Sequence, residues 1–219
     1  MTSTWRGQGP APSFVSIDFE CANASHASIC AIGVTRVTDG VVGPPRHWFV
    51  RPRPPFDFLA GMNKRITGIE TTDLRDARDF AHWGPHLQRN IGDAIIVGHG
   101  VKSADLSMFE QSWHHAGLGT FFDTRFVCTV ELTQRLLPNM PSYKLDAVTR
   151  DLLGEDMPGH HRADVDAHTT ARIAVALLES SGLDINHLAR TRPGRAPRPI
   201  KPPKRAAWSY DLDTGRPRG

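Results

Sequence analysis

The order of two kinds of apolar pattern along the chain is the feature that most constrains its fold. Phe14 to Phe19 is a short apolar run typical of a buried strand, and Ile29 to Val37 alternates toward one face. Further short strands are expected at residues 47–50 and 94–97. Later segments repeat apolar residues every three or four positions, as amphipathic helices do: 103–115, 124–137, 143–153 and 164–180. Strands that dominate early and helices that dominate late predict an α/β domain with a mixed sheet flanked by helices.

Prolines and glycines mark where several of these elements end. The run Arg51-Pro-Arg-Pro-Pro forbids regular strand pairing after residue 50. A helix is expected from about residue 79 to 90, with a kink or restart at Gly84-Pro85. The strand at 94–97 leads directly into Gly98-His99-Gly100, which places a histidine at its far end.

The positive charge of the chain is concentrated in its last segment. Residues 191–219 hold eight Lys or Arg against two Asp, a charge of +6. Because the whole chain has a net charge of +3, residues 1–190 carry −3. Six prolines and no apolar periodicity indicate an extended or disordered tail. We therefore expect a flexible N-terminus at 1–12, one domain at 13–190 and a basic, proline-rich tail at 191–219. The tail is interpreted in three ways: as a segment attracted to phosphates, as a partner-binding segment or as a solvated linker.

Composition argues against a membrane or secreted protein. No apolar run approaches the roughly 20 residues that a spanning helix needs, and the N-terminus lacks the features of a secretory signal. The three cysteines fit neither a disulfide framework nor a zinc module. A cytoplasmic protein with reduced thiols and no membrane partner is expected.

Acidic residues stand at three places where sheet geometry can bring them together. Asp18 and Glu20 lie two apart at the end of the first strand, so they project from one face. Asp105 lies near the start of the helix expected after the strand at 94–97, and Asp166 lies on the first turns of the last helix, with His161 in the loop before it. Hard divalent cations prefer such carboxylates, although solvated acids and a helix N-terminal acid are equally ordinary readings of each piece alone.

The order of these pieces resembles the DEDDh family of 3′→5′ exonucleases. An Asp-x-Glu on a first strand, an Asp after a middle strand and a His five residues before the last Asp form its pattern. Supporting pieces are Ile66-Thr67-Gly68-Ile69, Gly98-His99, Asp123-Thr124, Tyr143-Lys144-Leu145 and His161-Arg-Ala-x-x-Asp166-Ala167. The resemblance runs from about Phe14 to Leu178 and is nearest to the proofreading epsilon-subunit branch of bacterial DNA polymerase III. It implies a ribonuclease H-like fold.

The resemblance also implies what the residues do. Asp18, Glu20, Asp105 and Asp166 would bind two Mg²⁺ or Mn²⁺ ions, and His161 would be the general base. Phe19, Cys21 and His99 would contact the substrate, a single-stranded DNA or RNA with a 3′ end. The products would be nucleoside 5′-monophosphates, and a polymerase or repair protein would be a further partner.

The chain departs from the family pattern around its third acid. Cys21, Gly100 and Ala104 replace the usual Thr, Asn and Phe, and the stretch from His99 to Asp105 is one residue longer. Two alternatives therefore stay open: a non-catalytic nucleic-acid-binding or polymerase-associated module, and an RNA-specific trimming enzyme.

Overall fold

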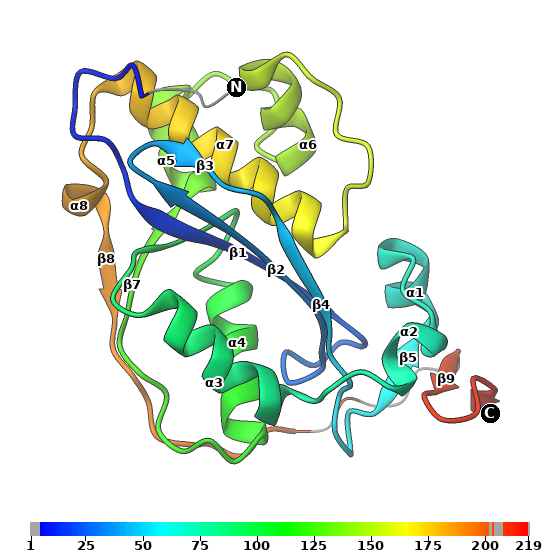
Figure 1. The fold of residues 1–219 in the computed structure, drawn as a ribbon. Coiled ribbons are helices and arrows are strands. Elements are labelled where there is room, and N and C mark those ends of the chain that lie inside the picture. The colour runs from blue at the N-terminus through cyan, green and yellow to red at the C-terminus, as the bar shows by residue number, and fades with distance from the viewer. Residues whose placement is uncertain (1–4, 202, 204–207, 219) are drawn as a thin grey trace.

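The computed structural model describes residues 5–201, 203 and 208–218, and within them a mixed sheet forms the centre of the molecule (Figure 1). Seven strands of this described part belong to the sheet, in the order β3-β2-β1-β6-β7-β8, with β4 also paired to β2. Their bounds are β1 Phe14–Cys21, β2 Ile29–Thr38, β3 Val41–Val42, β4 Arg46–Phe49, β6 Ile96–Gly98, β7 Thr124–Cys128 and β8 Arg190–Arg192. Pairing is antiparallel for β1 with β2 and β7 with β8, and parallel for β1 with β6 and β6 with β7. The predicted mixed α/β architecture is confirmed.

Helices cover both faces of this sheet (Figure 1). On one face lie α3 (Phe80–Ile91) and α4 (Asp105–His115); on the other lie α5 (Thr129–Leu136), α6 (Leu145–Val148) and α7 (Ala163–Ser181). Strand β1 alternates between the two cores: Val15 and Ile17 pack toward α3 and α4, and Phe14 packs toward α7. Asp18 and Glu20 share the side of Phe14, so the sheet aims both carboxylates toward α7.

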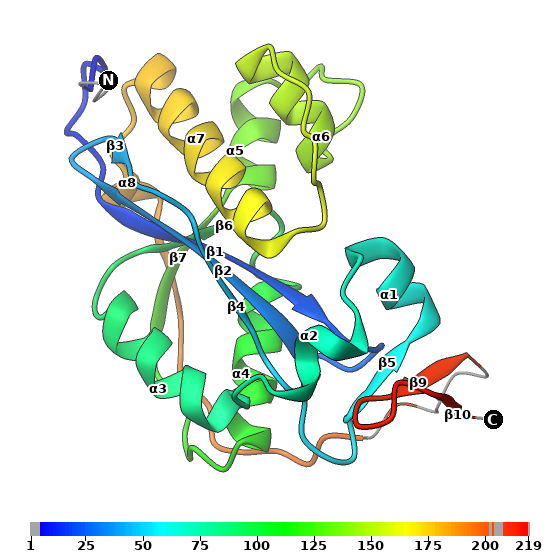
Figure 2. The ribbon, with the colours of Figure 1, turned by 45° about the vertical axis from the view of Figure 1, so that its right-hand side comes forward.

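A smaller sheet lies beside the main one (Figure 2). It joins β5 (Phe58–Ala60) to β9 (Ser209–Asp211) and β10 (Pro217–Arg218), next to α1 (Gly61–Thr67) and α2 (Thr71–Arg75). Leu59, Leu74 and Leu212 form part of its buried core. The segment 191–219, expected to be extended and unpacked, therefore contributes strands to both sheets within its described residues. Strand pairing between residues 58–60 and 209–211 depends on contacts between distant segments, which no local pattern reports.

The described part of the N-terminus also makes contacts. Residues 1–4 of the expected flexible segment lie outside the described residues. Trp5 Nε1 donates to the Gly9 carbonyl at 2.9 Å, and the Arg6 amide donates to Glu179 of α7 at 2.8 Å.

Several predicted helices differ from the observed elements. The helix expected at 124–137 is wrong in its first five residues, because Thr124–Cys128 forms strand β7 before α5 begins. The segment 143–153 is split into α6 and the π-helix η1 (Thr149–Leu153). Of the kink or restart expected at Gly84-Pro85, the restart does not occur, since α3 continues through Pro85. A short α8 (Ile185–Leu188) precedes β8. In the described part of the chain no helix combines the length and apolar character needed to cross a membrane.

Candidate active site

Two carboxylates of β1 face the beginning of α7. In the antiparallel register Asp18 lies opposite Gly33, and Glu20 lies opposite Ala31. A Cβ placed on Gly33 would lie 1.8 Å from the Ala163 carbonyl oxygen, so only glycine lets α7 approach β2 this closely. The first turns of α7 are thereby held directly over the end of β1.

Asp166 completes this group from the first turns of α7. Carboxylate oxygens of Asp18, Glu20 and Asp166 all lie within 4.8 Å of one another. Asp166 is 4% exposed, whereas Asp18 and Glu20 are partly accessible to solvent. A cation entering from solvent can reach the three groups together.

Asp105 approaches from the opposite side of β1, at the first position of α4. Its Oδ1 accepts the Phe19 amide at 3.2 Å, and its side chain is 3% exposed. The longer stretch before it is taken up by a turn: Gly100 has a φ of +83° and its carbonyl accepts the amides of Ser103 and Ala104 at 3.2 and 3.3 Å. The extra residue therefore leaves Asp105 bonded to β1 between the two predicted ligands of that strand.

The four carboxyl groups disfavour one another's ionised form. Burial and then the charges of Asp105, Glu20 and Asp166 raise the pKa of Asp18 well above its usual value. Burial followed by the neighbouring acids raises the pKa of Glu20 to about 8, and burial raises the pKa of Asp105 to about 7. Burial also raises the pKa of Asp166, against hydrogen bonds from His160 and His161 that lower it.

No Lys or Arg in the described residues forms an ion pair with these four acids. The four neighbouring carboxylates therefore have no Lys or Arg to neutralise them in that part of the chain. Their oxygen atoms are the ligands that hard divalent cations prefer. The residues present therefore have the chemistry that a divalent-cation site needs.

Two histidines lie beside Asp166. His160 Nδ1 is 3.1 Å from Asp166 Oδ2, and the His161 backbone amide donates to the same oxygen at 3.2 Å. The two imidazole rings stack with centroids 3.9 Å apart. His161 has a φ of +70°, a strained conformation for a non-glycine residue, and its ring is exposed. His160 was not singled out from the sequence, although its adjacency to His161 was the available signal.

The predicted substrate-contacting residues are placed differently. The Phe19 side chain is 4% exposed and packs edge-on against Phe109, 5.7 Å between centroids, so it faces the core and only its backbone lies at the site. Cys21 is also buried, and burial raises the pKa of its thiol to about 12. Its carbonyl accepts the Asn63 side-chain amide at 2.8 Å.

His99 forms hydrogen bonds with two other segments of the chain. Its Nε2 lies 2.8 Å from the Tyr143 carbonyl and its Nδ1 lies 2.9 Å from the Thr129 hydroxyl. A carbonyl only accepts, so Nε2 carries the proton and Nδ1 of the neutral ring accepts from Thr129. Burial lowers the pKa of His99, which is consistent with this neutral form. Both ring nitrogens are thus engaged with the protein.

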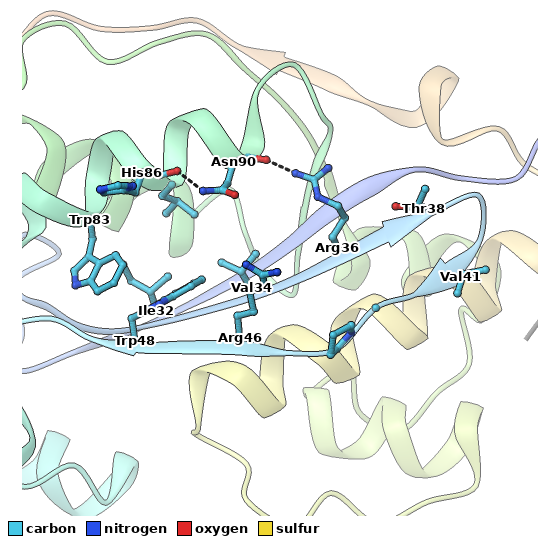
Figure 3. A pocket seen from close by; sticks show the side chains of 13 residues that line it. Ile32, Val34, Arg36, Thr38, Val41, Arg46, Trp48, Trp83, His86 and Asn90 are labelled. Atoms are coloured by element: carbon cyan, nitrogen blue, oxygen red, sulfur yellow. Dashed lines mark hydrogen bonds between the residues drawn. The ribbon is translucent and has the colours of Figure 1, made fainter. Parts of the chain in front are cut away.

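A cavity of about 290 Å³ adjoins the acids. It is lined by residues of the β1–β4 region, the α1–α2 connection and the start of α7, among them Glu20, Phe49, Ile69 and His161. A larger cavity, of about 580 Å³, lies on the α3 face of the sheet (Figure 3). Its lining includes Trp48 and Trp83, whose ring centroids are 5.4 Å apart. Because Asp18 and Glu20 project from the other face, the larger cavity is separate from the acids.

Sequence comparison finds relatives over most of the chain. The profile of a family described as exonuclease matches residues 15–174. The epsilon subunit of DNA polymerase III from Aquifex aeolicus is 27% identical over 168 residues, 76% of this chain and 80% of the relative. The PolC-type DNA polymerase III of Thermotoga petrophila is 28% identical over 76% of this chain but only 12% of the relative. The 3′-5′ exonuclease DinG of Bacillus subtilis is 26% identical over 76% of this chain and 18% of the relative.

Solved structures share the fold. Exonuclease X in complex with 5′-overhanging duplex DNA superposes with a TM-score of 0.63 at 24% identity, covering 80% of this chain and 96% of that one. Exonuclease I from Methylocaldum szegediense superposes with a TM-score of 0.64 at 16% identity, covering 78% of this chain and 41% of that one. The expected ribonuclease H-like fold is confirmed.

Proposed function

Because the chain belongs to the exonuclease family, we propose that it hydrolyses phosphodiester bonds one nucleotide at a time from the 3′ end of DNA, using two divalent cations. The observation that carries this proposal is the convergence of Asp18, Glu20 and Asp166 within 4.8 Å, with Asp105 bonded to the same strand. The products are nucleoside 5′-monophosphates.

The four acids are proposed to hold Mg²⁺ or Mn²⁺. When bound, two such ions activate a water molecule and stabilise the leaving 3′-oxygen. Asp18, Glu20 and Asp166 provide neighbouring oxygens, and Asp105 provides its carboxylate from the other side of β1. The raised pKa values of Glu20 and Asp105 support this assignment, because a bound cation would stabilise the ionised carboxylates that burial and the neighbouring acids disfavour.

His161 is proposed as the general base that takes a proton from the attacking water. Partial burial and the neighbouring His160 lower the pKa of His161, so its ring is neutral and able to accept a proton at pH 7. Its exposed ring can turn toward the substrate while its backbone amide stays bonded to Asp166. His160 would position Asp166 through its Nδ1.

The backbone of Phe19 and Cys21, and the cavity beside Glu20, are proposed to receive the terminal nucleotide. Phe49 and Ile69 offer apolar surface in that cavity, which suits a base, and Glu20 and His161 stand at its edge. His99 supports this region through Tyr143 and Thr129.

DNA is preferred over RNA as the proposed substrate, since relatives across most of this chain carry the name DNA polymerase III. A polymerase or repair protein is accordingly proposed as a partner, and the cytoplasm as the location. An RNA-trimming enzyme and a non-catalytic binding module remain the competing functions.

The proposal is tested with 5′-labelled single-stranded DNA, recessed duplex DNA and single-stranded RNA, in Mg²⁺, Mn²⁺ or EDTA. We expect a ladder that shortens from the 3′ end, requires metal and is absent for Asp18→Ala. Asp93→Ala, which changes an exposed acid with no ionic partner among the described residues, is the matched control and should cleave normally. A folded protein that binds these substrates but cleaves none would establish the binding module.

A further inference from the structure

A third concave surface lies along α4, and one of its walls is formed by residues 192–201, which follow the part of the chain that the family profile matches. It has a volume of about 540 Å³ and lies between the β1–β2 turn, one side of α4 and the segment after β8. Its lining includes His26, Glu110, His114, Arg195, Arg198 and Lys201. The segment after β8 passes beneath α4 on its way to β9 (Figure 2). We call this surface the basic groove.

The segment that forms one wall of the basic groove is fastened to the domain. Arg192 and Glu110 form an ion pair whose side chains are 13% and 9% exposed. The Gly194 amide donates to Asp123 at 2.7 Å, and the Phe121 amide donates to the Arg195 carbonyl at 2.8 Å.

Gly194 also approaches the domain closely, since a Cβ there would lie 2.1 Å from the Phe121 carbonyl oxygen. His114 Nε2 is 3.0 Å from the Arg195 carbonyl and caps the same contact from α4. These contacts hold residues 192–195 against the domain, so Arg195 has a fixed position and Arg198 and Lys201 follow within six residues.

The groove is positively charged. Arg195, Arg198 and Lys201 are exposed and pair with no acid among the described residues. Glu110, the acid of the lining, is already neutralised by Arg192. Three uncompensated cations in one concavity attract a polyanion.

Two of the elements that line the basic groove also lead to the acids. Its wall includes Ser107, two residues after Asp105 on α4, and the β1–β2 turn that follows Glu20. From Asp105 to His114 the helix rises by about 14 Å, which corresponds to roughly four nucleotides at 3.4 Å each. A strand whose 3′ end lies at the acids can therefore continue along the groove.

We propose that the basic groove binds the phosphodiester backbone of the substrate strand, a few nucleotides before its 3′ end. This inference rests on the proposed function. It extends that function because it gives the basic segment after residue 191 a role in binding strands that are longer than the few nucleotides at the acids. Contacts to phosphates carry no base preference, so the groove is indifferent to sequence.

The test removes the three charges together in Arg195→Gln/Arg198→Gln/Lys201→Gln. The matched control, Arg78→Gln/Arg135→Gln/Arg216→Gln, removes three other exposed cations that pair with no acid among the described residues. Fluorescence anisotropy with a 5′-labelled 20-nucleotide single-stranded DNA in EDTA gives Kd over a range of salt. We expect the groove variant to raise Kd roughly tenfold or more and to reduce the slope of log Kd against log salt by about 2, from about 0.7 per lost phosphate contact. The control variant should bind like the wild type.

A second variant distinguishes the effect of the groove's geometry on DNA binding from the effect of the protein's net charge. Asp123→Ala removes the acceptor of the Gly194 amide and one negative charge. General electrostatics predicts tighter binding of DNA by this variant, whereas a loosened groove predicts a higher Kd, which is the result expected here.

The proposed function is measured separately, as metal-dependent cleavage of a 5′-labelled dinucleotide, which is too short to reach the groove. Wild type and groove variant should cleave it at equal rates. Equal Kd values for the 20-nucleotide strand in the groove and control variants, with cleavage intact, would overturn the groove alone. No cleavage of any substrate, with Kd still dependent on the three cations, would overturn the nuclease and leave the groove as a nucleic-acid-binding surface.

Discussion

Asp18 and Gly33 face each other across the antiparallel pair β1 and β2, and the Ala163 carbonyl of α7 occupies the space where a side chain of residue 33 would stand. The position of Asp166 relative to Asp18 therefore depends on a glycine that bears no functional group. A packing contact of the fold sets the spacing between two carboxylates of the site.

Gly33→Ala is expected to separate these carboxylates. A methyl group 1.8 Å from a backbone oxygen cannot be relieved by a side-chain rotation, so α7 must move away from β2. We expect a destabilisation of about 2–3 kcal/mol and a loss of cleavage of at least roughly tenfold, measured by denaturant unfolding and by single-turnover cleavage. Gly117→Ala is the control: its methyl group meets no atom within 4 Å, so it should lose stability through its φ of +75° but retain activity. Normal activity of Gly33→Ala would show that α7 does not set the site.

Glu20→Gln is expected to stabilise the metal-free protein at pH 8. The pKa of Glu20 is raised from 4.5 to about 8, so between these values the folded state holds a proton that the unfolded state has lost. Stability must fall as pH rises through this window, and a neutral glutamine removes that loss. After allowance for solvent screening we expect a gain of about 1–2 kcal/mol, or roughly 2–8 °C in Tm, at pH 8 and little change at pH 4.5. Asp93→Asn at the surface should show no such pH-dependent gain. An equal or lower Tm for Glu20→Gln at pH 8 would contradict the raised pKa.

Metal binding is expected to release protons near neutral pH. Glu20, with a pKa of about 8, and Asp105, with a pKa of about 7, must lose their protons before their oxygens bind a cation. The apparent affinity for Mn²⁺ should therefore rise by about tenfold or more per pH unit between pH 6 and 8. Calorimetry in two buffers of different ionisation enthalpy counts the released protons. Binding with no proton release at pH 7 would rule out these ligands.

The two histidines are expected to differ in the step that they affect. His161→Ala should reduce the single-turnover rate by about 10²- to 10⁴-fold at saturating Mn²⁺, the range typical of a lost general base. His160→Ala should act mainly on metal affinity, because its Nδ1 lies against Asp166. If His160→Ala instead lowers the rate more than His161→Ala does, the base is His160.

Local sequence pattern was sufficient for the central elements. Alternation and apolar runs predicted β1, β2 and α7 because each buries a regular face, and the i, i+2 spacing placed Asp18 and Glu20 on one side. Thr124–Cys128 was misread because this five-residue strand, with four residues buried, continues directly into α5, where the apolar spacing is helical. The approach of His160 to Asp166 is a tertiary contact, and only the adjacency of His160 to His161 pointed to it in the sequence.

Long-range pairing accounts for most of what the sequence did not reveal. The ion pair of Arg192 with Glu110 joins residues 82 apart, and the pairing of β9 with β5 joins still more distant segments. A basic, proline-rich composition indicates that a segment does not fold on its own. It does not report the contacts that the segment makes with the rest of the domain.

Strand β8 has a consequence for how the chain can be shortened. It forms one edge of the main sheet, is three residues long and carries Arg190 and Arg192, features that discourage a second molecule from adding its own strand there. A protein ending at residue 190, where the composition changes, would instead present Thr124–Cys128 as a bare edge with a mostly apolar sequence. Such a truncated protein is expected to self-associate, so the segment that looks dispensable by composition covers an edge of the sheet that would otherwise be open to strand addition.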